Sequence, residues 1–344
     1  MAQAIAYRVK SGGHTAASRA QESDCQLLSL RVDLDMDGVG GHCAIELGDS
    51  TIAVQPGAAV KVELDAGDGM LPVFTGQVDN VRIGASSQWL LADDSLAALA
   101  RLDLEAAYQD VKAGFIVKDI FQQAGVTAGE VVDGPQLPTY VLHRGPRALR
   151  HLQTLAELCG ADLYTDGQGR VHCAVPRTGG TAEQTFRHGE NILTLDLHLM
   201  PPAYDSVEVW GEGAASSQGA DKYYWLVTDL TGVNGKAALT ANSQVNPGSL
   251  GKLPRPIYQG AVRSGEAARG VAEAQVKALA ARWLRGHIEV YGTPGVEPGH
   301  RVQIVGLPTD HSATAVLASG HLPRVRRVQH RLDRQRGLLT RLDF

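Results

Sequence analysis

The sequence predicts a mainly β protein with a small α+β module between two β-rich parts. Three observations predict this class: a β-type motif near both ends of the chain, helical periodicity between its two copies, and a composition rich in glycine and poor in aromatic residues. Of the 344 residues, 39 are glycine and 5% are aromatic, as in chains with many short strands and tight turns. We expect the three parts at residues 1–98, 99–190 and 191–344.

The motif near the two ends consists of two blocks. The sequence VQPGAAVKV at 54–62 reappears as VEPGHRVQI at 296–304, and TGQVDNVR at 75–82 is answered by SGHLPRVR at 319–326. In each copy Pro-Gly supplies a turn whose second position tolerates positive φ, and the alternating apolar residues after it predict a half-buried strand. Because the blocks keep their order and nearly their separation, we interpret them as a duplicated β-unit. The alternative is a pattern common to any antiparallel sheet.

Helical periodicity appears between the two copies. We expect one helix at 93–107 after an acidic capping residue, and a second at 113–124 that stops at Gly125. A third begins near Pro146 and ends at Gly160.

Strands, a loop and a last helix are expected in the rest of the chain. The predicted elements are a hairpin at 162–172, strands at 192–199 and 206–210, a loop over 211–255 with one strand at 223–227, and a helix at 265–284.

The composition restricts the class of protein. A hydrophobic content of 44% with 20% charged residues is that of a folded globular protein, and a net charge of -5 gives no overall attraction to nucleic acid or to an anionic membrane. The N-terminal residues lack the apolar core of a signal peptide and no later stretch approaches the length of a membrane span, so we expect neither. The four cysteines are scattered, which indicates neither a disulfide framework nor a zinc ribbon. We therefore expect synthesis in the cytoplasm without membrane insertion.

The motifs of catalysis and ligand binding are incomplete. The segment DLDMDG at 33–38 begins like a calcium loop, but the twelfth position, which should be glutamate, is Ala44. The glycine-rich runs lack the strand-turn-helix context of a phosphate loop, and the twelve histidines form no i, i+4 pair. We predict no catalytic residue, no metal site and no cofactor.

The order of these features resembles the late control protein D family of contractile phages. This family includes the baseplate hub of such phages and the N-terminal part of type VI secretion spike proteins. The resemblance covers about 31–344 and is carried by VQPGAAVKV with FTGQVDNV, by LRHLQTLAELCGADLYTDGQGRVH, and by YGTPGVEPGHRVQI. Unlike type VI spike proteins, this sequence does not continue into an OB domain and a β-prism, so the resemblance implies that the spike is a separate polypeptide.

The resemblance implies two β-barrels similar to the tail-tube subunit, with the α+β module beside them. Three copies would present six barrels around one axis, so that a homotrimer could join a sixfold inner tube to a threefold central spike. The implied partners are the inner tube protein, the central spike protein, other baseplate components and a tape measure protein. The assembled location would be the baseplate of a phage tail, a bacteriocin or an injection system.

Interface residues are expected at the repeat blocks and in the basic C-terminal segment. The candidates are Pro56, Gly57, Gly76, Pro298, Gly299, Gly320, Arg324, Arg326 and Arg327. For the arginines, contact with a partner's acidic surface or with cargo competes with simple solvation. Two other functions stay open: a hub-associated peptidoglycan hydrolase, for which no acid and base pair can be located, and a nucleic-acid-binding barrel, which rests only on the arginines.

Overall fold

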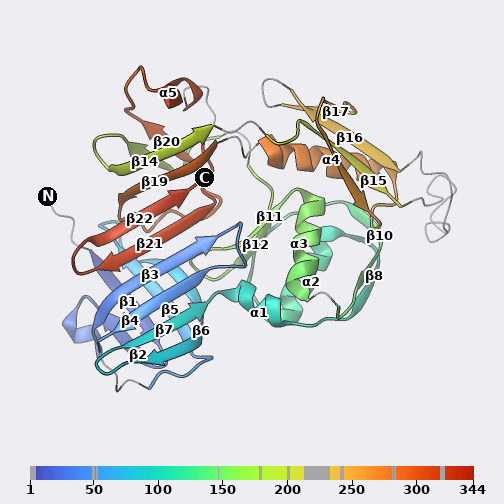
Figure 1. Ribbon diagram of the computed structural model, residues 1–344. Helices are drawn as coiled ribbons and strands as arrows, with labels where there is room; N and C mark the ends of the chain where they lie inside the picture. Colours follow the sequence, from blue (N-terminus) through green and yellow to red (C-terminus); the bar gives the residue numbers. More distant parts are fainter. Residues whose placement is uncertain are drawn as a thin grey trace.

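The structure is a computed structural model of the chain (Figure 1). It describes residues 5–48, 51, 53–145, 147–177, 180–199, 202–212, 233–240, 244–280, 282, 284–317 and 322–344.

An eleven-stranded sheet runs through the part of the molecule that contains both ends of the described chain (Figure 1). Its strand order is β14-β19-β22-β21-β3-β4-β7-β6-β5-β1-β2. We call β1 to β7 the first β unit; its strands are β1 (Ala6–Ser11), β2 (His14–Ala17), β3 (Leu27–Asp35), β4 (His42–Leu47), β5 (Ala59–Asp65), β6 (Leu71–Ile83) and β7 (Gln88–Asp93), with a short 3-10 helix at Ala20–Glu22. Alternating side chains of these strands form the core of the unit, because successive residues of a strand point to opposite faces.

The second β unit completes the sheet with residues from the C-terminal half. Its elements are β13 (Gln184–Arg187), β14 (Ile192–Leu199), β19 (Leu284–Tyr291), β20 (Val302–Val305), α5 (Ser312–Leu317), β21 (Arg327–Asp333) and β22 (Gly337–Asp343). Strands β13 and β20 pair in parallel as a separate two-stranded sheet over this unit. Its core is a cluster of its own around Phe186, Ile288 and Val328.

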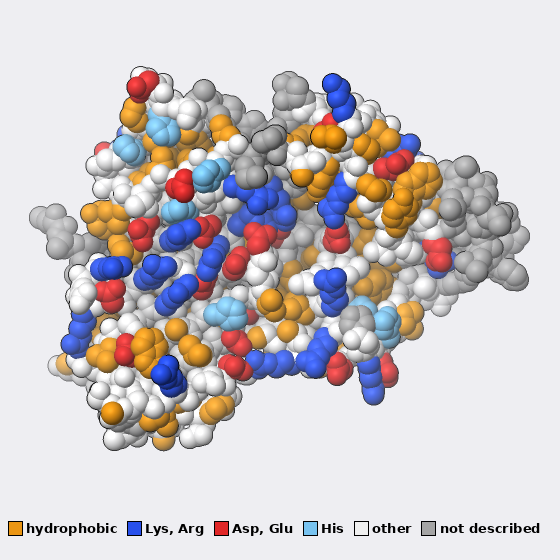
Figure 2. Space-filling view, viewed as in Figure 1, with side chains coloured by type: hydrophobic (Ala, Val, Ile, Leu, Met, Phe, Trp, Pro, Cys, Tyr) orange, Lys and Arg blue, Asp and Glu red, His pale blue; other side chains and the backbone are white. Residues whose placement is uncertain are grey.

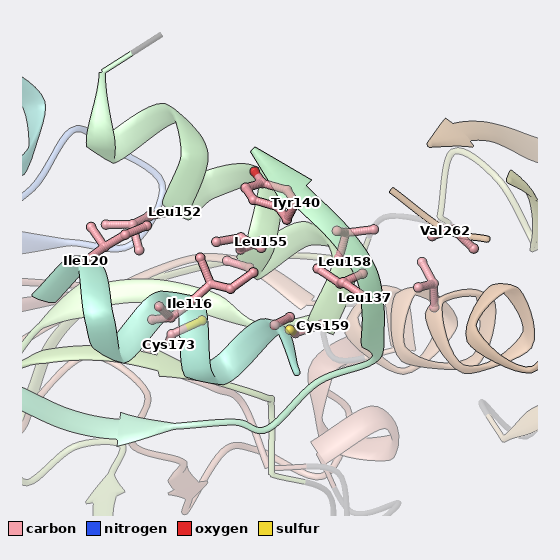
Figure 3. Close-up of a cluster of buried hydrophobic side chains, with 14 of the residues drawn as sticks. Ile116, Ile120, Leu137, Tyr140, Leu152, Leu155, Leu158, Cys159, Cys173 and Val262 are labelled. Carbon is pink, nitrogen blue, oxygen red and sulfur yellow. The ribbon is translucent and has the colours of Figure 1, made fainter. Parts of the chain in front are cut away.

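The α+β module follows the first β unit and lies beside the large sheet, at one end of its strands (Figure 1). It consists of α1 (Ser95–Arg101), β8 (Ala106–Lys112), α2 (Ala113–Ala124), β9 (Ala128–Val131), β10 (Gln136–Leu142), α3 (Ala148–Cys159), β11 (Asp162–Thr165) and β12 (Val171–Ala174). Ile116 and Ile120 of α2 meet Leu152 and Leu155 of α3 in its core (Figure 3). Both helices end at a glycine in the left-handed conformation, as expected.

A four-stranded sheet backed by α4 continues the core of the module. The elements are β15 (Ser206–Gly211), β16 (Asn234–Leu239), β17 (Val245–Pro247), β18 (Pro254–Gln259) and α4 (Gly265–Ala280). Val207 and Val209 of β15 and Val271 of α4 belong to the same buried cluster as α2 and α3. Val262 is a further member of this cluster (Figure 3). The residues predicted as one part, 191–344, thus divide among three buried clusters; the domain limits themselves stay predictions.

The class predicted from sequence is confirmed, since the fold is mainly β with a few helices. The expected helix at 93–107 was too long: α1 ends at Arg101, because apolar residues from Leu102 onward recur every second position, and β8 begins at Ala106. No helix in the described part of the chain is both long and apolar enough to span a bilayer.

The loop expected over 211–255 is also wrong for its described part, which contains β16, β17 and the start of β18. The composition of β16, NGKAAL, does not favour a strand, but small residues are required there. A Cβ on Gly235 would lie 2.2 Å from the Ala268 carbonyl carbon of α4, so only glycine allows this close packing. The strand expected at 223–227 falls outside the described residues.

Candidate assembly surfaces

The two β units are joined along one pair of strands, β3 and β21, which we call the seam (Figure 1). These strands pair antiparallel over the whole length of β21. On the core side of the seam, Leu332 packs into the core of the first unit and Val328 into the core of the second. The seam therefore holds the two units side by side in one sheet.

Polar side chains reinforce the seam on its other face. Asp33 of β3 accepts hydrogen bonds from Arg327 Nε at 2.6 Å and from Gln329 Nε2 at 2.9 Å, both on β21. Burial alone would raise the pKa of Asp33, but these hydrogen bonds outweigh it and the net shift is downward. Because Asp33 belongs to the DLDMDG segment at 33–38, a carboxylate that a calcium loop would use is bound to an arginine instead.

An ion cluster lies where the two β units and the module meet. It consists of Asp37, Asp162, Arg282, Arg324 and Arg326. Asp162, the first residue of β11, accepts from Arg324 Nη1, from Arg326 Nη2 at 3.2 Å and from Arg282 Nη2 at 3.1 Å. Arg326 also donates to Asp37 from Nε at 2.7 Å.

Most of this cluster is buried. The side chains of Asp162, Arg324 and Arg326 are only 8%, 7% and 11% exposed. Burial by itself would raise the pKa of Asp162, but the positive charges of Arg326 and Arg324 hold it at about 2. The cluster therefore connects the module to the segment that follows β3 and to the segment that precedes β21.

The β11–β12 hairpin is wedged between the two β units. The carbonyl of Gly167, at its turn, accepts from Thr75 Oγ1 of the first unit at 3.1 Å, and its N–H donates to Glu297 Oε1 of the second unit at 3.3 Å. A Cβ on Gly167 would lie 2.3 Å from the Pro72 carbonyl oxygen, so only glycine fits. The hairpin predicted from sequence thus contacts both β units and connects them through hydrogen bonds.

The two Pro-Gly turns of the repeat have the same hydrogen-bonding pattern. Gly57 and Gly299 both have positive φ, +87° and +91°. Each glycine N–H donates to a valine carbonyl of the facing segment, Val78 at 2.7 Å or Val325 at 2.8 Å, and the N–H of that valine donates back to the carbonyl of the residue after the glycine. Val325 is therefore the counterpart of Val78, whereas matching the sequence blocks aligned it with Val81. The turns correspond, but the register of the second block was wrong by three residues.

The surroundings of the two turns differ. Pro56 and Gly57 are exposed, and a Cβ on Gly57 would meet nothing within 4 Å. Pro298 is buried, and a Cβ on Gly299 would lie 2.9 Å from the hydroxyl of Tyr164, in the β11–β12 hairpin. The second turn is therefore covered inside the chain, and the first is available at the surface.

The other predicted interface residues are placed as follows. Gly76 is half-buried against the end of β7, where a Cβ would lie 2.2 Å from the Asp93 carbonyl oxygen. Arg324, Arg326 and Arg327 form the intrachain ion pairs given above. Gly320 lies outside the described residues. A role of these residues between subunits stays a prediction.

The large sheet ends in an open edge at β14. In β19, the carbonyl of Gly286 accepts from the Phe344 N–H, on the side of β22. Backbone groups along an antiparallel strand alternate between its two sides, and Leu195 and Leu197 of β14 are the partners of Ile288 and Gly286. The N–H groups of these two leucines therefore point to the side of β14 that has no neighbouring strand among the described ones. Strand β18, at an edge of the four-stranded sheet, contains Pro254 and Pro256, which have no N–H to offer. Of these two edges, only β14 offers a row of free donors along its length.

One histidine beside a carboxylate resembles part of a catalytic pair. His172 Nε2 lies 3.1 Å from Asp166 Oδ2, and its Nδ1 accepts from the Glu130 backbone N–H at 3.0 Å. Both ring nitrogens are therefore occupied, and no lone pair remains for a general base. In the described part of the chain, no group of three or more His, Cys, Asp and Glu side chains is arranged to hold a metal ion.

The chain shares its fold with tail proteins of known structure. It matches the 43 kDa tail protein of prophage MuSo2 from Shewanella oneidensis with a TM-score of 0.67 and 13% identity, over 99% of this chain and 98% of that one. A tail protein from Neisseria meningitidis matches with a TM-score of 0.63 and 16% identity, over 98% and 95%. An Escherichia coli component of the type VI secretion system, described as structurally similar to the phage T4 tail proteins gp27 and gp5, matches with 0.56 and 12%, over 97% and 75%. No family profile and no curated protein matches the sequence.

The sequence pointed to two of the three arginines of the ion cluster, Arg324 and Arg326, but not to Arg282 or to the acidic partners. The run of arginines after Pro323 is visible in the sequence, whereas Asp162 is 162 residues away from Arg324 and belongs to an ordinary hairpin. The hairpin pattern at 162–172 is the signal that the sequence offers there, and it does not indicate a contact with the arginines. At these sequence separations, the contact follows only from the fold.

Proposed function

We propose that the chain is the structural hub subunit of a contractile tail or injection system. In this proposal a homotrimer with pseudo-sixfold symmetry adapts the inner tube to the central spike. The observation that carries it is the side-by-side arrangement of two β units in one sheet, each with the same Pro-Gly turn. Three such chains supply six similar units, which is the number that a sixfold tube requires.

The two edge strands of the large sheet support a closed ring. Open strand edges attract further strands, and proteins cover or pair them. Strand β14 offers free N–H groups at one end of the sheet, and β2 forms the other end. We propose that β14 of one subunit pairs with the β2 end of the next, which would close the ring without leaving an edge.

The proposed partners follow from this geometry and from the shared fold. The α+β module and the α4 sheet lie at one end of the strands, and the other end carries mainly turns (Figure 1). One end would contact the central spike and the other the inner tube, with further baseplate components and a tape measure protein as additional partners. The proposed role is structural, and its location is the assembled baseplate; no residue is assigned to catalysis.

A proline in β14 tests ring closure. Leu195→Pro removes an N–H group at the free edge, and Leu195→Ala loses the same packing but keeps the backbone donor. We expect Leu195→Ala to remain a trimer and Leu195→Pro to become monomeric with an unchanged circular dichroism spectrum, as measured by native mass spectrometry. A folded Leu195→Pro variant that is still a trimer would show that β14 is not the ring contact.

A further inference from the structure

We propose that the exposed face of the large sheet binds an acidic segment of a polypeptide at Arg31 and Arg331. This inference goes beyond the hub proposal, because it concerns what the face binds and applies to the chain in any oligomeric state. If the ring forms with this face inward, the bound segment would lie in the channel.

The two arginines lie directly opposite each other across the seam. Arg31 of β3 and Arg331 of β21 are partners in the antiparallel register and both are exposed on the same face. Figure 2 shows Lys and Arg side chains gathered among acidic ones over this part of the sheet. Like charges in directly opposed positions destabilise a sheet, so an anion that binds both arginines would relieve this repulsion.

The nearby carboxylates are already bound to other groups. Asp33 accepts from Arg327 and Gln329, and its contact with Arg31 Nη2 is longer, at 3.4 Å. Asp333 Oδ1 accepts two backbone N–H groups of the β21–β22 turn. Within the described residues Arg331 has no ion pair. The two guanidinium groups therefore have most of their donors available to a ligand.

Apolar residues flank the arginine pair on both sides. In strand order, the row across the sheet consists of Tyr291, Leu339, Arg331, Arg31, Ala44 and Leu91. Tyr291 and Leu91 are 57% and 45% exposed. Neighbouring strands are ~4.8 Å apart, so the row spans ~24 Å, which about seven residues of extended peptide cover. The row fits acidic side chains that are flanked by apolar ones.

The same face disfavours nucleic acid. Acidic side chains surround the row on this face: Asp35, Glu46, Glu289 and Asp343. An extended polyphosphate would place a negative charge beside each of them, whereas a peptide can restrict its carboxylates to the two arginines. The geometry points to an acidic peptide with apolar flanks.

A synthetic peptide tests this site. We would titrate the purified chain with a peptide of about nine residues, with two central glutamates between leucine and tyrosine residues, and with the same peptide carrying glutamines. We expect the glutamate peptide to bind more tightly, and Arg331→Gln to weaken it about fivefold at low salt, the size of one exposed ion pair. Arg19→Gln, whose side chain is 80% exposed elsewhere in the first unit, should have no effect.

Two results would overturn the proposal. One is equal binding of both peptides or an unchanged affinity of Arg331→Gln; the other is tighter binding of single-stranded DNA of equal charge. Thermal unfolding without peptide gives a second readout: Arg331→Gln should raise the midpoint, because it removes repulsion, whereas a structural arginine would lower it. Oligomeric state is measured separately, so a monomeric chain that binds the peptide contradicts the hub and not this site.

Discussion

Replacement of Asp162 by asparagine should destabilise the chain more than any other single charge change in the ion cluster. The variant keeps the shape of the side chain but removes the only carboxylate that neutralises Arg324 among the described residues. Because both side chains are less than 10% exposed, the arginine would be left buried and uncompensated. Breaking a buried pair in this way costs about 3–5 kcal/mol. We expect the low end, about 3 kcal/mol, since Arg282 and Arg326 retain other contacts or solvent.

Urea denaturation of wild-type and variant chains measures this effect. The control is Asp37→Asn, which removes the other carboxylate of the cluster, 57% exposed, and should cost less than about 1 kcal/mol. The pKa of Asp162, held at about 2, adds a pH dependence: its contribution is present above about pH 4 and is lost as the pH falls toward 2. A loss below about 1 kcal/mol for Asp162→Asn, or an equal loss for both variants, would refute the reasoning.

Further predictions concern the repeat turns and the core of the seam. Gly299→Ala should destabilise the chain more than Gly57→Ala, as measured by thermal unfolding, because both glycines have positive φ but only Gly299 packs on Tyr164; equal losses would contradict this packing. Burial lowers the pKa of His330, which is hydrogen-bonded to Thr340, to about 4. Above about pH 6.5 this histidine therefore does not lower the free energy of unfolding, and between pH 6.5 and pH 4 it lowers that free energy by about 3 kcal/mol. His330→Gln should flatten the stability profile over this range, and an unchanged profile would exclude this histidine as its cause.

Local patterns in the sequence were sufficient for much of the fold. Helices α2 and α3 were predictable because their apolar residues recur on one face and a glycine follows each helix. The β11–β12 hairpin was predictable from its glycine-bearing turn. These features depend on neighbours in sequence, which a single chain displays directly.

The failures share a different physical cause. The composition of β16 does not favour a strand because its packing against α4 requires a small residue. The seam forms between β21 and β3, which lie almost 300 residues apart in the sequence. The acidic partners of the basic segment, Asp33 and Asp162, were missed for the same reason. Of the candidate interface residues that the structure describes, only Pro56 and Gly57 lie fully at the surface; Pro298, at the second turn, is buried. Such contacts depend on tertiary packing, which overrides local propensity.

The most direct test of the hub proposal is the molar mass of the purified chain by native mass spectrometry, combined with negative-stain class averages. The proposal predicts a homotrimer, three times the 36.5 kDa chain, whose averages show sixfold character at the end that contacts the tube. A chain that stays monomeric at all concentrations, and also when spike and tube proteins are added, would contradict it.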